Sequence, residues 1–238
     1  DRFPPQLAAA QVYFQVTKDG YAVTAGDILM GKVLPEQKGI KDGAYLPQET
    51  RLWPSSTIPF MIAKEVGNSQ PIIEAISYFN QNTPVRFVEV EEGDEEGIIF
   101  LPHEELCASH LGRVGGFQPI FISGRCGKSE VIHELMHALG FVHEHSRQDR
   151  DRFVKVHWQN IKEEFLFQFN KMPDQLVHNY SGSVFDFDAE SIMLYPEEAF
   201  AKTPGLKTLE AIGGTRIRPS RNELSRMDRE RVYYLYGR

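Results

Sequence analysis

The stretch Ile132–Ser146 reads IHELMHALGFVHEHS and places four histidines within fifteen residues. On an α-helix, residues four apart lie on one face, so His133 and His137 can point their imidazoles at one ion. Gly140 tolerates a positive φ angle and can turn the chain so that His143 returns to the same ion. The pattern H-E-x-x-H-x-x-G-x-x-H therefore predicts a zinc site with three histidine ligands.

Three imidazoles leave the fourth position of a tetrahedral zinc ion for a water molecule. Zinc lowers the pKa of such a water to about 7, and Glu134 can accept its proton while the water attacks a carbonyl group. The same carboxyl group can then give the proton to the leaving amine. We therefore predict a hydrolase with one Zn²⁺ per chain and Glu134 as general base. An amphipathic helix with core histidines is the simpler alternative, and it explains the full pattern less well.

Composition limits the classes of partner. The chain has 33 acidic and 26 basic residues, a net charge of −7 and no basic run interleaved with aromatic residues. We therefore expect no nucleic-acid partner. No stretch approaches the ~20 apolar residues that a membrane helix requires, so we expect no membrane partner. Residues 1–5 do not resemble a signal peptide, and we expect that any export signal has been removed or lies outside the sequence.

Hydrophobic patterning predicts that strands and helices are mixed along the chain. Helices are expected at 71–79, 129–139 and 158–172, and Ser225 is expected to cap a last helix that runs to Tyr236. Strands are expected at 58–62, 85–90, 98–101 and 119–122. Residues 35–43 are rich in Lys, Gly and Asp, which predicts an exposed linker.

The run from His133 to Glu144, followed by HSRQDRD, and the turn SIMLY at 191–195 resemble the astacin family of zinc metalloendopeptidases, which are metzincins. The resemblance covers about residues 44–238. It implies a secreted, extracellular α+β protein with a twisted, mostly antiparallel sheet and two long helices in an upper lobe, about 44–143. It also implies an irregular lower lobe, about 144–238, and a zinc cleft between the lobes.

The resemblance assigns roles to further residues. Tyr195 would ligate zinc at rest and swing away to stabilise the oxyanion, and Met193 would lie under the metal. Glu144 would contact the amino terminus that is freed by activation. Cys107 and Cys126 match a disulfide of the family. From the residues alone, an aromatic such as Tyr195 is more often a core residue than a ligand. Glu144 is equally compatible with the surface, and the two cysteines with idle buried thiols.

Astacins are made as zymogens whose prosegment carries F-x-G-D, with the aspartate in the place of the water. The segment Thr24–Ile28 reads TAGDI and keeps the Gly-Asp pair, so Asp27 is predicted as a zinc ligand of the latent form. From the residues alone, a Gly-Asp pair also predicts a plain turn. We therefore expect an inhibitory prosegment at 1–43 and a catalytic domain at 44–238, with activation by a second protease near Lys38 or Lys41.

The sequence thus predicts a latent, monomeric zinc endopeptidase that acts on protein or peptide substrates. A catalytically silent zinc-containing binding or scaffold module is the first alternative, and the presence of Glu134 and Tyr195 argues against it. A zinc hydrolase of small amides is the second. Substrate-binding residues are not predicted. By resemblance to the family, a cation would favour an acidic residue after the scissile bond, and three arginines are candidates for it: Arg216, Arg218 and Arg221.

Overall fold

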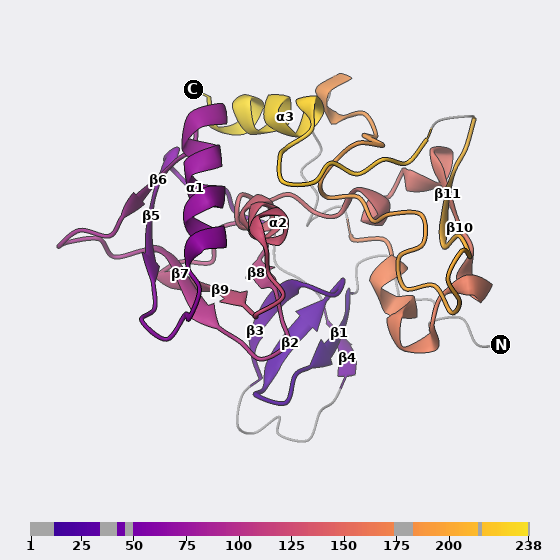
Figure 1. Cartoon of the computed structure of the whole chain (residues 1–238), viewed down its shortest axis with the longest axis horizontal. Coiled ribbons are helices and arrows are strands. Elements are labelled where there is room, and N and C mark those ends of the chain that lie inside the picture. The colour runs from indigo at the N-terminus through magenta and orange to yellow at the C-terminus, as the bar shows by residue number, and fades with distance from the viewer. Residues whose placement is uncertain (1–11, 34–41, 46–49, 174–182, 214–215, 238) are drawn as a thin grey trace.

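A computed structural model of the chain describes residues 12–33, 42–45, 50–173, 183–213 and 216–237 (Figure 1). Nine strands form one sheet in the order β4-β1-β2-β3-β8-β9-β7-β5-β6. The strands are β1 (Val12–Val16), β2 (Tyr21–Thr24), β3 (Ile28–Lys32), β4 (Asp42–Tyr45), β5 (Thr57–Ile62), β6 (Arg86–Glu89), β7 (Gly97–Pro102), β8 (Ala108–His110) and β9 (Phe117–Ile122).

The sheet is mixed and contains more parallel pairs than the resemblance implied. The antiparallel pairs are β1–β2, β1–β4, β2–β3 and β8–β9. The pairs β3–β8, β5–β6, β5–β7 and β7–β9 are parallel. A parallel pair needs a crossover connection, and helix α1 (Gln70–Asn82) supplies it between β5 and β6. The α+β class is confirmed.

The two long helices of the predicted upper lobe are α1 and α2 (Lys128–Ala138). Each buries an apolar face against the sheet in one large core, which also receives Met193 and the last helix. Burial of this face, rather than intrinsic propensity, fixes where α2 lies, because an isolated helix of its length is marginal in water. The core side chains of α1 are Ile72, Ala75, Ile76 and Phe79, and those of α2 include Val131, Ile132, Leu135 and Met136.

The chain after His143 has little regular structure, as predicted, and Figure 1 shows it beside the large sheet. Its elements are the 3₁₀ helices η2 (Glu144–Ser146), η3 (Arg150–Arg152), η4 (Trp158–Asn160), η5 (Glu163–Phe169) and η7 (Ser183–Phe185), the strands β10 (Val154–Val156) and β11 (Leu209–Ala211), and helix α3 (Arg226–Tyr236).

The helix predicted at 158–172 is wrong. Ile161 forms an isolated β-bridge with Ala201, which divides this segment into the short helices η4 and η5. Phe169 packs in a second, smaller core with Leu194 and Leu209, so its burial comes from the tertiary structure rather than from helical periodicity. In the described part of the chain, no helix has both the length and the apolar character needed to cross a membrane.

The N-terminal residues form strands that the sequence did not predict. β1, β2 and β3 form a meander that adds to the edge strand β8 of the larger sheet. Asp42 and Gly43 belong to β4, which pairs with β1, so they are not part of a linker. Residues 35–41 of the predicted linker, including Lys38 and Lys41, lie outside the described residues.

Candidate metal centre

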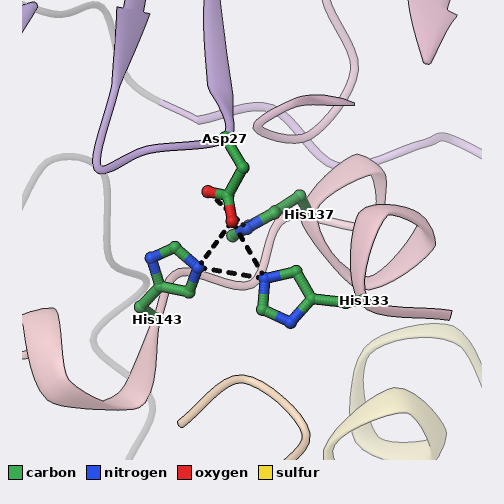
Figure 2. Close-up of side chains that lie close together, drawn as sticks. All are labelled: Asp27, His133, His137 and His143. Carbon is green, nitrogen blue, oxygen red and sulfur yellow. Dashed lines mark hydrogen bonds and ion pairs between the residues drawn. The ribbon is translucent and has the colours of Figure 1, made fainter. Parts of the chain in front are cut away.

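Three histidines and one aspartate converge at one point (Figure 2). His133 and His137 come from α2, His143 follows that helix, and Asp27 comes from the turn between β2 and β3. One potential ligand atom from each of the four residues lies within 4.8 Å of all the others. The Nε2 atoms of His133 and His143 are 3.0 Å apart, and Asp27 Oδ2 is 3.4 Å from the first and 3.2 Å from the second. The structure therefore brings together four of the five predicted metal ligands.

The hydrogen bonds of the rings show why the site fits a cation. His133 Nδ1 lies 3.0 Å from the carbonyl oxygen of Ile192, and His137 Nδ1 lies 2.8 Å from that of Phe141. Because a carbonyl group only accepts, both Nδ1 atoms carry the hydrogen and both Nε2 atoms present a lone pair. His137 Nε2 is buried without a hydrogen-bond partner. Lone pairs facing one another at this distance need a positive ion between them, and three imidazoles with a carboxylate suit zinc.

The charge states of these residues follow from burial and from Asp27. Burial lowers the pKa of His137 to about 4 despite the opposing effect of Asp27. The pKa of His143 is lowered for the same reason. For His133, burial also disfavours the charged form, but hydrogen bonding and attraction to Asp27 outweigh it and raise its pKa. Burial disfavours ionisation of Asp27, but the facing His143 and His137 hold its pKa well below the usual value.

Glu134 projects beside the cluster and is only 2% exposed. Its Oε2 atom is buried and has no hydrogen-bond partner. Burial raises the pKa of Glu134 well above its usual value, and the charges of Asp27 and Glu130 add to this effect. A carboxyl group with a free oxygen and a raised pKa next to a metal centre is suited to accept and return a proton.

Two turns position His143, the third histidine, and Met193. Gly140 has a φ of 102°, as predicted, which lets the chain leave α2 and bring His143 back to the cluster. The backbone N–H of Glu144 donates to the carbonyl oxygen of Met193 at 2.9 Å. Met193 is 1% exposed and packs in the large core together with α2. The turn at residues 191–195, which we call the methionine turn, is therefore connected by a hydrogen bond to the residue that directly follows His143.

Asp228 holds the other side of the methionine turn, a role that sequence reasoning missed. Its carboxylate accepts from Ser191 Oγ at 2.7 Å and from the N–H of Ile192 at 2.9 Å. It also closes a capping box with Ser225 at the start of α3. The cap at Ser225 was predicted, but only the fold shows that the carboxylate of Asp228 also reaches Ile192, the partner of His133.

Tyr195 lies at the site but its hydroxyl group contacts other atoms. The hydroxyl oxygen is 3.0 Å from the carbonyl oxygen of Ala25 and 3.1 Å from Gln168 Oε1. Its ring stacks on that of His145 with centroids 3.9 Å apart. Burial raises the pKa of Tyr195 well above its usual value, so the hydroxyl group stays protonated. Ligation of the metal by Tyr195 stays a prediction.

The turn that presents Asp27 depends on a glycine. Gly26 has a φ of 98°, and a Cβ atom there would lie 2.8 Å from Cδ of Gln168. The carbonyl oxygen of Asp27 accepts from the N–H of Ser109 at 2.9 Å, next to the β3–β8 pairing. Thr24, where the family pattern has Phe, donates through Oγ1 to the carbonyl oxygen of Tyr13 at 2.6 Å. The Gly-Asp pair therefore lies in a turn that is held by hydrogen bonds on both sides.

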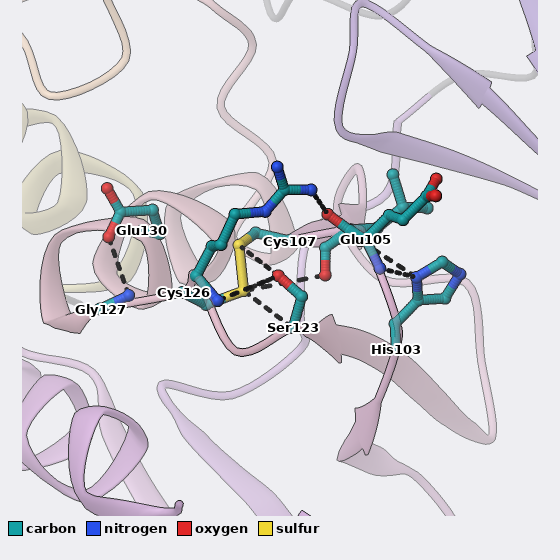
Figure 3. The surroundings of a disulfide bond; sticks show 9 residues. His103, Glu105, Cys107, Ser123, Cys126, Gly127 and Glu130 are labelled. Carbon is teal, nitrogen blue, oxygen red and sulfur yellow. Dashed lines mark hydrogen bonds between the residues drawn. A yellow bond between two sulfur atoms is a disulfide. The ribbon is translucent and has the colours of Figure 1, made fainter.

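Cys107 and Cys126 form a disulfide, which confirms the pairing (Figure 3). The bond joins the segment before β8 to the segment before α2. Nearby, Arg125 Nη2 donates to the carbonyl oxygen of Glu105 at 3.0 Å. The idle-thiol alternative is therefore excluded, and the disulfide fixes one rim of the site.

An open cleft of about 1060 Å³ borders the metal centre. Asp27, His133, Glu134 and Tyr195 contribute to it. Its walls carry charged and aromatic side chains, among them Glu105, Arg125, Glu130, Phe165, Phe200 and Arg221. Of the three arginines considered for substrate recognition, Arg221 lines this cleft, whereas Arg216 and Arg218 are exposed and lie outside its lining.

The α2 histidines, the turn at Gly140 and the methionine turn beneath them are the features by which the metzincin class of zinc metallopeptidases is defined. A family model described as Astacin, a family of peptidases, matches residues 46–237. The chain therefore belongs to the astacin family. Family membership and the four-residue cluster together confirm zinc as the predicted cofactor.

Individual relatives agree with this assignment. Zinc metalloproteinase nas-14 of Caenorhabditis elegans is 35% identical over 191 residues, which are 78% of this chain and 37% of that protein. High choriolytic enzyme 1 of Oryzias latipes is 36% identical over 185 residues, 76% of this chain and 66% of that protein. Astacin-like metalloprotease toxin 1 of Loxosceles intermedia is 33% identical over 201 residues, 82% of this chain and 72% of that protein.

The fold agrees as well. The solved structure of high choriolytic enzyme 1, a hatching enzyme zinc-protease, superposes with a TM-score of 0.67 at 30% identity, covering 80% of this chain and 99% of that one. The chain spans little more than a third of the length of nas-14 and two thirds of the length of the hatching enzyme.

Proposed function

We propose that this chain is a latent zinc-dependent endopeptidase that hydrolyses peptide bonds of proteins. The observation that carries the proposal is the unpartnered carboxylate oxygen of Glu134 beside three imidazole Nε2 atoms that converge on one point. A silent binding module would not need this buried, unpaired acid, because burying such a group is unfavourable.

His133, His137 and His143 would hold the zinc ion. When bound, zinc acts as a Lewis acid that polarises a carbonyl group and lowers the pKa of water. Glu134 accepts the proton of the attacking water and gives it to the leaving amine. Tyr195 donates its hydroxyl hydrogen to the oxyanion, and the open cleft provides room for an extended chain.

Latency follows from Asp27. In this proposal residues 1–43 are an inhibitory prosegment, and the Asp27 carboxylate takes the position at which water would be activated. Two small hydrophobic cores that include residues of this segment support the proposal. One joins Val12, Ala25 and Ile28 to Met172, and the other joins Val23 and Leu29 to residues of β8 and β9. The segment therefore contacts the chain on both sides of the metal centre.

Release of this segment requires a second protease that cuts near residues 38–44. We further propose that the protein acts outside the cell and as a monomer. The Cys107–Cys126 disulfide supports an oxidising compartment, since such bonds are rare in the cytosol. Arg221 in the cleft supports recognition of acidic substrate residues.

The test combines metal analysis with cleavage of casein before and after limited trypsin treatment. We expect about one zinc ion per chain, no cleavage by the intact chain and cleavage after treatment. Glu134→Ala should retain zinc and the fold but lose activity by several orders of magnitude. Loss of zinc is expected instead for His133→Ala. Trypsin-treated protein that binds zinc but cleaves neither casein nor peptides would favour the silent module, and cleavage of small amides alone would favour the second alternative.

A further inference from the structure

Glu144 is a buried carboxylate that accepts four hydrogen bonds within the intact chain. Its side chain is 4% exposed. Oε1 accepts from the N–H of Asp188 at 2.8 Å, from Arg147 Nη1 at 3.0 Å and from Arg231 Nη2 at 3.0 Å. Oε2 accepts from Arg231 Nη1 at 3.2 Å. Oε1 therefore shares its two lone pairs among three donors, whereas Oε2 has one donor and room for a second.

Arg231 is fixed on the opposite side as well. Its side chain is 5% exposed on α3. Its Nε donates to the carbonyl oxygen of Val184 at 2.9 Å, and its Nη2 also donates to that of Asp186 at 2.6 Å. The guanidinium group therefore meets Glu144 with two nitrogens in a fixed fork, a geometry that lysine or a terminal amine does not provide.

We propose that Arg231 is a positioning residue that balances the charge of Glu144, so that the mature enzyme does not need a particular amino terminus for this purpose. The resemblance to astacins led us to expect that a freed amine pairs with Glu144. Here an arginine of α3 supplies the cation. The consequence reaches the site because Glu144 directly follows His143 and its N–H donates to Met193. This inference rests on the proposed protease activity.

The space beside this pair is small. A cavity of about 50 Å³ is bordered by Glu144, Arg231, Phe141 and Leu235. A cavity of this size holds a few water molecules. A terminal residue that entered it would have to displace water and would meet a carboxylate that already pairs with Arg147 and Arg231.

The test uses the full chain with a specific protease site inserted so that cleavage leaves Gly43, Ala44 or Tyr45 as the first residue. An Ala44 form acetylated at its amine is the fourth sample. We expect kcat/KM on a fluorogenic peptide and the unfolding midpoint to agree within about twofold and a few degrees among the four. Arg231→Gln should lower kcat/KM at least tenfold and make it vary with the terminus. Arg226→Gln, on the exposed side of the same helix, is the matched control and should change neither.

The double variant E144Q/R231Q tests whether the charge of Arg231 matters or only the packing of its side chain. Because it removes both charges, its unfolding midpoint should lie above that of R231Q alone. A tenfold loss of wild-type kcat/KM on acetylation would overturn the proposal, and so would R231Q behaving like R226Q. If every form binds zinc but none cleaves peptides, the proposed function fails. The unfolding midpoints of the same variants then still decide whether Arg231 balances Glu144.

Discussion

At the scale of single residues, Tyr195 shows how one hydroxyl group can serve two states. In the intact chain it is held by Ala25 and Gln168. Release of residues 1–43 would remove Ala25 and leave the hydroxyl group able to donate to an oxyanion. In the mature form, Tyr195→Phe should therefore lower kcat by ~10²–10³-fold, the usual effect of one oxyanion donor, with KM and zinc content unchanged. Steady-state kinetics with metal analysis test this. A kcat within fivefold of wild type would make Tyr195 a packing residue.

We expect His110 to make the stability of the chain sensitive to pH. Leu29 of β3 is its partner in the register, and burial lowers the pKa of His110 to about 4, despite a hydrogen bond with the Leu29 backbone. Once the ring is exposed by unfolding, its pKa returns to about 6.5, so the unfolded state binds a proton more readily than the folded state. The stabilisation is complete above about pH 6.5 and is lost as the pH falls toward 4, by up to about 3 kcal/mol.

This dependence can be measured on the intact chain. Urea unfolding at pH 7.5 and pH 5 should show a larger loss of stability for the wild type than for His110→Gln, which has no proton to gain. Equal losses in the two proteins would show that His110 does not cause the loss of stability at low pH.

At the scale of elements, Asp228 connects α3 to the turn that holds Ile192, the partner of His133. This carboxylate is fully buried and receives the N–H groups of Ser225 and Ile192 and the hydroxyl group of Ser191. Asp228→Ala would leave these donors without partners and remove the helix cap. We expect a loss of about 3 kcal/mol in unfolding free energy.

The same change should weaken zinc binding ~10-fold to 100-fold, since Ile192 orients His133 as an outer-shell partner. Urea unfolding and competition with a zinc chelator measure the two effects. Ser220→Ala, at the half-buried rim of the cleft, is a suitable control. If Asp228→Ala is destabilised but binds zinc as tightly as the wild type, then Asp228 does not influence the metal site.

The disulfide acts on the rim between β8 and α2. It closes a loop with a sequence separation of 19. Replacing both cysteines by alanine should lower the unfolding free energy by about 3 kcal/mol, because the open chain gains loop entropy. Comparison of the unfolding curves of the two proteins tests this. A difference below about 1 kcal/mol would mean that packing around Ser123 and Arg125 holds the rim without the bond.

The sequence predicted those elements whose signals are local. The helix cap at Ser225, the turn at Gly140 and the strands around Ile58 and Ile120 depend on neighbours in the chain, and all are present. The strands β1 to β4 were missed because the apolar residues in this part of the chain are scattered and form no periodic run. The convergence of His133, His137 and His143 was predictable from spacing alone. The pairing of Glu144 with Arg231 was not, because 87 residues separate them.

At the scale of the whole molecule, residues 12–33 connect the parts of the chain on either side of the metal centre. β3 pairs with β8 of the sheet, while Val12 and Ile28 pack against Met172, which follows the zinc-binding helix in the chain. The ion pairs at the rim, Lys18 with Glu105 and Asp19 with His103, lie at the surface and contribute little. Apolar packing and the turn at Asp27 therefore account for most of the attachment.

The proposed latency has two parts that mutation can separate. In this proposal the Asp27 carboxylate excludes water from the metal centre, and the surrounding segment occupies part of the cleft, which Gly26 and Asp27 line. Asp27→Ala removes the first part only, so the intact variant should bind zinc normally, cleave a small peptide and convert itself faster to a form that begins near Ala44.

Gly26→Ala should have a similar effect by another route, since a Cβ atom there meets Gln168 and displaces the turn. Asp19→Asn, in the same segment but at the exposed rim, is the control and should stay latent. Peptide cleavage by the uncut chains and sequencing of their amino termini give the result. If Asp27→Ala is as inactive as the wild type while trypsin activates both, covering of the cleft alone maintains latency and the carboxylate is dispensable for it.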